Sequence, residues 1–143
     1  MIFRQSNYNE CLPLLNTVWP DSFHIFPIDN SLGLVNWTVL EIDKTDPKFY
    51  AIEIDNKIVA SLHVFYASRD TLCLRGISGE ASEDQWQALF NIALSNAVGI
   101  RRVYTVFKEP INTLVASLGF KDVQGPFWTN DWQVFLAWKE LDD

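Results

Sequence analysis

The fold is decided by the stretch from Thr71 to Phe120, TLCLRGISGEASEDQWQALFNIALSNAVGIRRVYTVFKEPINTLVASLGF. Its apolar start, Thr71 to Ile77, predicts a buried strand. A turn at Ser78 to Ala81 and an amphipathic helix from Glu83 to Val98 follow, and Arg101 to Phe107 predicts a second buried strand. Two strands joined by a helix predict a parallel or splayed pair with a right-handed crossover connection.

The helix of this unit has the clearest pattern in the chain. Apolar residues recur at spacings of three and four, which places on one helical face Trp86, Leu89, Phe90, Ala93, Leu94 and Ala97. Ser82 and Gln85 are spaced as a capping box, in which each side chain binds the backbone amide of the other residue. Gly99 follows the last periodic residue and can adopt the left-handed conformation that ends a helix.

The chain continues after the second strand with a short helix and a hairpin. The helix is expected from Ile111 to Leu118, and Gly119 ends it. Phe120 to Val123 and Trp132 to Trp138 then predict a closing hairpin around the turn-rich segment Gly125 to Asp131.

The part before Thr71 contributes further strands and helices. Ile2 to Gln5 predicts a strand. A helix capped by Asn7 or Asn9 is expected to run to about Val18, with Pro13 in its first turn. A second helix is expected from Leu32 to Leu40, although Gly33 weakens its pattern.

The strongest hairpin signal lies just before the central unit. Phe49 to Ile54 and Lys57 to Phe65 are two runs of β-forming residues, and the pair Asp55-Asn56 between them suits a tight turn. The resulting order, β-α-α-β-β-β-α-β-α-β-β, predicts a mixed sheet with helices on its faces.

Composition limits the classes of function. The 143 residues predict a single domain, and 48% apolar and 14% aromatic residues indicate a packed core. Because the formal net charge is −7, binding to nucleic acid is disfavoured. No apolar run reaches the roughly 20 residues that span a bilayer, and the amino-terminal residues lack the pattern of a signal peptide, so we expect an intracellular protein without membrane association.

Cysteine and histidine are too few and too scattered to indicate a metal site. Cys11 and Cys73 lie in apolar segments, where a reduced, buried thiol is the usual state, and His24 and His63 are isolated. We therefore expect no metal. Cys73 is expected to be a core thiol, with a nucleophile as the alternative. His63 is expected to be a half-buried strand residue, with a base as the alternative.

The order of elements, the hairpin ending in Ile58 to Leu62 and the corner Leu118-Gly119-Phe120 resemble the GNAT family of acetyl-CoA-dependent N-acetyltransferases. The resemblance covers most of the chain. It implies an α/β fold with a mixed, largely antiparallel sheet of six to seven strands and helices on both faces. It also implies an acetyl-CoA site along the strand before the long helix and at the turn that follows it.

The residues that correspond to this implied cofactor site are Cys73, Leu74, Arg75, Gly76, Ile77, Gly79, Ala81, Ser82 and Lys108. The chain departs from the family motif Q/R-x-x-G-x-G/A, because Ser78 and Glu80 occupy the two small-residue positions counted from Arg75. A shift by one residue places Gly79 and Ala81 at these positions, but Gly76 then stands where Gln or Arg belongs. Gly76 and Gly79 are either remnants of a pyrophosphate turn or the glycines of an ordinary strand-to-helix turn. Acidic side chains at this turn would oppose a bound pyrophosphate.

The catalytic landmarks of the family are also altered. Lys108 stands where the family often has an asparagine, and Val115 stands where it often has a general-acid tyrosine. The strand Thr71 to Ile77 holds no carboxylate that could act as a general base. No catalytic residue can therefore be assigned. We interpret the acetyl-CoA motif as degenerate, which makes catalytic activity doubtful.

A weaker resemblance, over about 45 positions, is to the small GNAT-like internal virion proteins of short-tailed bacteriophages. It rests on the run Ile77 to Ala81, the helix with Trp86 and Leu89, and the corner at Gly119 followed by an aromatic strand. It implies a virion protein that retains the fold without the chemistry.

The last hairpin is a candidate surface for binding other protein subunits. It is rich in aromatic residues, which are favoured at the centres of protein interfaces: Phe127, Trp128, Trp132, Phe135 and Trp138. Alternation along Trp132 to Trp138 places apolar residues on both faces, which predicts a strand covered on both sides. Two functions thus stay open, acetyl transfer from acetyl-CoA to an amine and a non-catalytic structural or interaction role.

Overall fold

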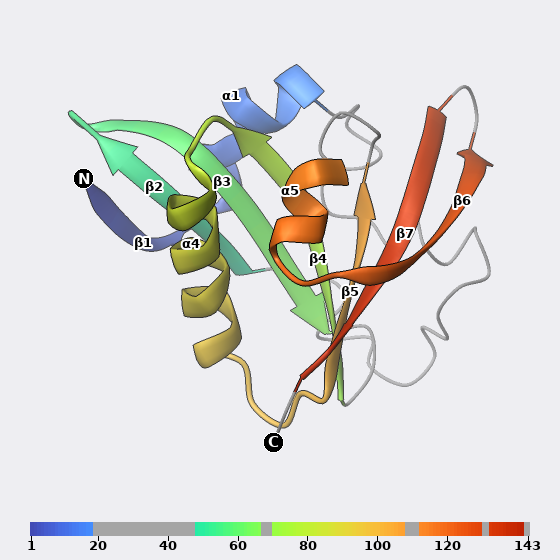
Figure 1. Ribbon diagram of the computed structural model, residues 1–143. Helices are drawn as coiled ribbons and strands as arrows, with labels where there is room; N and C mark the ends of the chain where they lie inside the picture. Colours follow the sequence, from blue (N-terminus) through green and yellow to red (C-terminus); the bar gives the residue numbers. More distant parts are fainter. Residues whose placement is uncertain (19–47, 67–69, 108–111, 130–131, 142–143) are drawn as a thin grey trace.

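A computed structural model describes residues 1–18, 48–66, 70–107, 112–129 and 132–141 of the chain. These residues form a seven-stranded mixed sheet with helices on both faces (Figure 1). Along the chain the elements are β1 (Ile2–Ser6), α1 (Tyr8–Val18), β2 (Lys48–Ile54), β3 (Lys57–Tyr66), β4 (Thr71–Gly79), α4 (Glu83–Ser95), β5 (Arg102–Phe107), α5 (Asn112–Ser117), β6 (Lys121–Thr129) and β7 (Trp132–Glu140). The expected helix from Leu32 to Leu40 lies outside the described residues.

The strand order across the sheet is β1-β2-β3-β4-β5-β7-β6. Every neighbouring pair is antiparallel except β4 and β5, which run parallel and are joined through α4. The sheet is thus largely antiparallel, with the predicted strand-helix-strand unit at its centre.

Side-chain alternation on β2 separates the two faces of the sheet. Tyr50 and Ile52 belong to the larger apolar cluster, which includes Leu89 and Phe90 of α4, whereas Phe49 packs with Cys11 and Leu15 of α1. Strand residues alternate between faces, so α4 and α1 cover opposite faces. Figure 1 shows α5 beside α4, and Val115 of α5 and Leu118, which follows the helix, join the larger cluster.

The hairpin between β2 and β3 forms as predicted. Asp55 and Asn56 both have positive φ, 51° and 64°, as a two-residue type I′ turn requires. The capping box of α4 is also confirmed, with Gln85 N donating to Ser82 Oγ at 3.2 Å and Ser82 N donating to Gln85 Oε1 at 2.9 Å.

Several predicted boundaries were wrong. The turn expected at Ser78 begins later, because Ser78 and Gly79 still pair with Ser61 and Ala60 of β3. Helix α4 ends at Ser95 rather than Val98, with Asn96 as its C-cap.

Two further corrections concern proline-containing segments. Pro13 lies inside α1 rather than in its first turn, because the helix already begins at Tyr8, with Asn7 Oδ1 accepting from Glu10 N at 2.9 Å. The segment with Gly125 and Pro126 was expected to be a turn, but it is part of β6, which pairs with β7 through two shifts of register.

Strand β7 is buried on both faces, as the alternation predicted. Ala137 and the half-buried Phe135 pack into the cluster shared with α4 and α5, whereas Leu136, which points to the other face, is also buried. Trp138 lies beside Tyr104, with ring centroids 5.2 Å apart, and under the Arg102 guanidinium. The side chains of Phe127, Trp128 and Trp132 lie outside the described part of the chain.

Candidate functional site

The central parallel pair separates part of the way along its length. Four residue pairs join β4 to β5, from Thr71 and Arg102 to Leu74 and Thr105. Thr105 Oγ1 donates a 2.9 Å hydrogen bond to the Leu74 carbonyl at this last pair. From Arg75 onward, β4 pairs only with β3 among the described strands, although β5 continues to Phe107. One edge of β4 therefore leaves the ladder just before the strand reaches α4.

A bulge lies in β4 directly after the separation. The register with β3 shifts between the pairs His63–Arg75 and Ser61–Ser78, and Gly76 there has φ +65°. A Cβ at Gly76 would lie 2.3 Å from His63 Nδ1, so only glycine fits beside this ring. The bulge is typical of strands that change direction next to a functional site.

Gly79 ends β4 in a second left-handed conformation, with φ +91°. A Cβ at this position would lie 2.2 Å from the Val59 carbonyl oxygen, and the next amide, that of Glu80, donates to the same oxygen at 3.0 Å. Gly76 and Gly79 thus both occupy positions whose φ angles and close contacts require glycine, and Gly79 lies where the chain turns from β4 toward α4.

The amino-terminal end of α4 combines open amides with acidic side chains. The capping box occupies the amides of Ser82 and Gln85, whereas those of Glu83 and Asp84, the first two of the helix, contact no acceptor among the described residues. Such amides and the helix dipole attract anions. The side chains of Glu80, Glu83 and Asp84 are all exposed at the same turn and oppose that attraction.

The structure brings most of the predicted site residues to this region. Cys73, Leu74, Arg75 and Ile77 are all at most 5% exposed, so β4 can present backbone rather than side chains to a ligand at its open edge. Ala81 packs against the core cluster of α4 and is only partly buried. Ser82 is taken up by the capping box. Lys108 lies outside the described residues.

The residues considered for acid and base chemistry are buried in the core. Val115 is 1% exposed and packs in the main apolar cluster, so this position donates no proton. His63 is 0% exposed and lies between Phe49 and Phe65, with ring centroids 4.8 and 6.4 Å away. His63 was expected to be half-buried, but its ring is fully buried because it packs against Gly76.

The sequence analysis missed Thr105 and the Val59 carbonyl. Thr105 is 0% exposed and fixes the point where β4 and β5 separate, and the Val59 carbonyl fixes the turn after Gly79. A threonine within a run of β-forming residues does not show from the sequence that its hydroxyl binds a neighbouring strand. The role of a backbone carbonyl cannot be read from the sequence, because every residue has one.

In the described ranges, no helix is both long enough and apolar enough to cross a membrane. The same ranges contain no cluster of three or more histidine, cysteine or acidic residues arranged to hold a metal ion.

Sequence comparisons find neither a matching family model nor a matching curated protein. Solved structures match over nearly the whole chain. A GNAT family acetyltransferase from Elizabethkingia anophelis, solved with acetyl-CoA bound, has a TM-score of 0.63 and 14% identity and covers 98% of this chain and 97% of its own. The aminoglycoside 6'-N-acetyltransferase from Enterococcus faecium has a TM-score of 0.63 and 12% identity, with the same coverage.

A third similar structure is the IAA acetyltransferase from Bacillus cereus, with a TM-score of 0.66 and 10% identity over 98% of this chain and 99% of its own. The matches cover 98% of this chain, so they include its seven-stranded sheet and the helices on both faces. This chain therefore has the fold of the GNAT acetyltransferases.

Proposed function

We propose that this chain binds acetyl-CoA at the separation of β4 and β5 and transfers the acetyl group to an amine. The observation that carries the proposal is the end of the β4–β5 ladder at Leu74 and Thr105, after which β4 has an edge open for an extended ligand. An open strand edge binds extended chains through backbone hydrogen bonds, and the amide-bearing pantetheine arm is such a chain.

The residues of this region fit one part of acetyl-CoA better than another. The edge of β4 from Arg75 to Ile77 would hold the pantetheine arm, and the open amides of Glu83 and Asp84 would face the pyrophosphate. Three carboxylates crowd this anion position, and each opposes the bound phosphate by some tenths of a kcal/mol to about 1 kcal/mol. We therefore expect weak binding of the pyrophosphate, with the pantetheine arm supplying most of the affinity.

The reaction would be a direct transfer. The amine nitrogen attacks the thioester carbonyl carbon, the new C–N bond forms, the C–S bond breaks, and the CoA thiolate leaves. The amine gives its proton to water, since β4 carries no carboxylate and Val115 cannot act as an acid. The contribution of this chain is thus to orient the two reactants, which supports a slow reaction.

Thermal unfolding with and without excess acetyl-CoA tests the proposal. Binding at a hundred times the dissociation constant stabilises by about 2.7 kcal/mol, which is a measurable rise in melting temperature. The double variant Glu80→Gln/Glu83→Gln should increase the rise, because it removes two charges from the anion position. Glu140→Gln, which changes an exposed carboxylate at the end of β7, is the matched control and should leave the rise unchanged. No rise for any of the three proteins contradicts the proposal.

A second candidate function is a non-catalytic protein that retains the fold. The observation that favours it is the combination of three carboxylates at the anion position with a valine at the position of the acid. In this case the chain is a structural or virion component that contacts other subunits through the last hairpin, near Phe135 and Trp138. Size-exclusion chromatography with light scattering would then show assembly, and acetyl-CoA would produce no thermal shift.

A further inference from the structure

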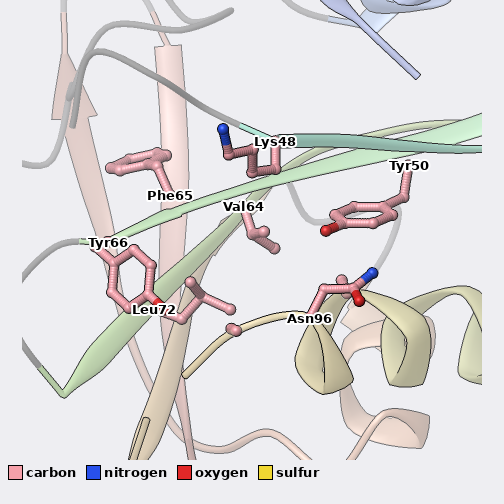
Figure 2. A pocket seen from close by; sticks show the side chains of 9 residues that line it. Lys48, Tyr50, Val64, Phe65, Tyr66, Leu72 and Asn96 are labelled. Carbon is pink, nitrogen blue, oxygen red and sulfur yellow. The ribbon is translucent and has the colours of Figure 1, made fainter. Parts of the chain in front are cut away.

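A cavity of about 90 Å³ lies at the end of α4 opposite its capping box (Figure 2). It is formed between the last turn of the helix and β2, β3 and β4, and is separate from the open edge of β4. Its lining residues are Lys48, Tyr50, Val64, Phe65, Tyr66, Leu72, Ala93, Asn96 and Ala97. The side chains of Lys48 and Phe65 point away from Asn96 in Figure 2, so the interior is lined mainly by the others.

A tyrosine hydroxyl faces the cavity and has no hydrogen-bond partner among the described residues. Tyr50 is 2% exposed, and within the part of the chain that is described its hydroxyl makes no hydrogen bond. Figure 2 shows this hydroxyl directed inward above the carboxamide of Asn96, whose side chain also has no hydrogen bond to the described residues. The hydroxyl can therefore donate to or accept from a molecule that enters the cavity.

The remaining walls are apolar and fixed in place. Val64, Leu72 and Ala93 belong to the main core cluster, and Ala97 packs against it. Tyr66 closes one side, and its hydroxyl is held by the backbone of Val98, accepting from the amide at 2.8 Å and donating to the carbonyl at 3.1 Å. The wall of Tyr66 thus cannot swing inward without losing two hydrogen bonds.

We propose that this cavity is a binding site for a small, uncharged aliphatic amide. A tyrosine hydroxyl and an asparagine carboxamide can each donate and accept, which matches the carbonyl and the N–H groups of an amide. A carboxylate fits less well between Tyr50 and Asn96, because the Lys48 side chain points away from Asn96 in Figure 2 and would leave a charge bound there unpaired. The cavity is smaller than the roughly 150 Å³ cavity that holds benzene, which limits a ligand to about four to six non-hydrogen atoms.

Titration of the full chain with 2-methylpropanamide, followed by backbone amide NMR, tests the site. We expect saturable shifts confined to residues around the cavity, such as Leu72, Ala93 and Asn96, with the amides of Glu83 and Asp84 unchanged. Tyr50→Phe should weaken binding by about three- to tenfold through the loss of one hydrogen bond, without lowering stability in the absence of ligand. 2-Methylpropanoate, of the same shape but charged, should bind at least about tenfold more weakly than the amide.

Ala97→Leu provides the second variant, because the larger side chain occupies the cavity while the hydroxyl of Tyr50 stays in place. Binding of 2-methylpropanamide should then be lost. The proposal would be overturned if Ala97→Leu or Tyr50→Phe bound 2-methylpropanamide as tightly as the native protein does. It would also be overturned if 2-methylpropanoate bound more tightly than the amide, or if the shifts were scattered over the whole chain. Acetyl-CoA binding plays no part in these measurements, so the outcome is independent of the function proposed for the edge of β4.

Discussion

The hydroxyl of Thr105 donates a 2.9 Å hydrogen bond to the backbone carbonyl of Leu74, and both residues are fully buried. They form the last pair between β4 and β5, so the side chain of Thr105 binds this carbonyl where the pairing ends. The arrangement satisfies a buried acceptor at the point where regular pairing stops, which allows the strands to separate without leaving that carbonyl unpaired.

Thr105→Val should destabilise the protein by about 1–3 kcal/mol, because it removes the hydroxyl, keeps the shape and leaves the Leu74 carbonyl buried without this bond. Urea unfolding measures the change. Thr17→Val is the matched control, since the exposed Thr17 hydroxyl donates to the Leu14 carbonyl at 2.6 Å and water can replace it. Equal effects of the two substitutions would contradict the role assigned to Thr105.

Gly79→Ala should destabilise more than Gly99→Ala. Both glycines have positive φ, 91° and 75°, and each alanine carries a conformational cost of about 1 kcal/mol. Only the Cβ at Gly79 meets backbone, 2.2 Å from the Val59 carbonyl oxygen, whereas the space at Gly99 is open to 4 Å. Thermal unfolding of the two variants measures the difference. If Gly79→Ala and Gly99→Ala lowered the melting temperature equally, the close contact between Gly79 and the Val59 carbonyl would not matter for stability.

Both cysteines should react slowly with a disulfide reagent until the protein unfolds. Cys11 and Cys73 are 0% exposed, and burial raises the pKa of the Cys11 thiol above its ordinary value of 9.0, which keeps the reactive thiolate scarce. Absorbance measurements of thiol release at pH 8 check this expectation. The variant Val98→Cys, at a position 81% exposed, should react at the rate of a free thiol and serves as the control.

Glu10 should contribute to stability at neutral pH and lose this contribution in acid. The hydrogen bonds from Arg4, at 2.7 and 3.1 Å, hold the pKa of Glu10 below its ordinary value of 4.5. Since the folded pKa is the lower one, the contribution is complete above about pH 4.5 and disappears as the pH falls through the folded pKa.

The difference in unfolding free energy between the native sequence and Glu10→Gln, measured from pH 6 to pH 3, should therefore shrink toward zero. NMR titration of the Glu10 carboxyl carbon measures the same property directly. A midpoint at or above 4.5 would contradict the structure.

Local signals in the sequence predicted the central part of the fold. The Ser82–Gln85 capping box and the Asp55-Asn56 turn depend on interactions between near neighbours, and both form as expected. The periodic apolar face of α4 likewise places Leu89 and Phe90 in the core. These features depend on short stretches of chain, in which the local sequence preference agrees with the final fold.

Boundaries and site geometry depend on contacts between distant residues and were harder to predict. Ser78 continues β4 because Ser61, on another strand, pairs with it, and no local signal distinguishes this from a turn. The bond from Thr105 to Leu74 and the cavity beside Tyr50 likewise arise from elements that meet only in the folded sheet. The resemblance to the acetyltransferases correctly implied the fold, because topology persists where individual residues change.

The position of β7 between β5 and β6 has a consequence for synthesis on the ribosome. Until Trp132 to Glu140 have left the ribosome, one edge of β5 is unpaired and β6 has no neighbouring strand among those described. A nascent chain halted before this point would expose an unpaired strand edge that promotes aggregation, so β7 is the strand that joins β6 to the rest of the sheet.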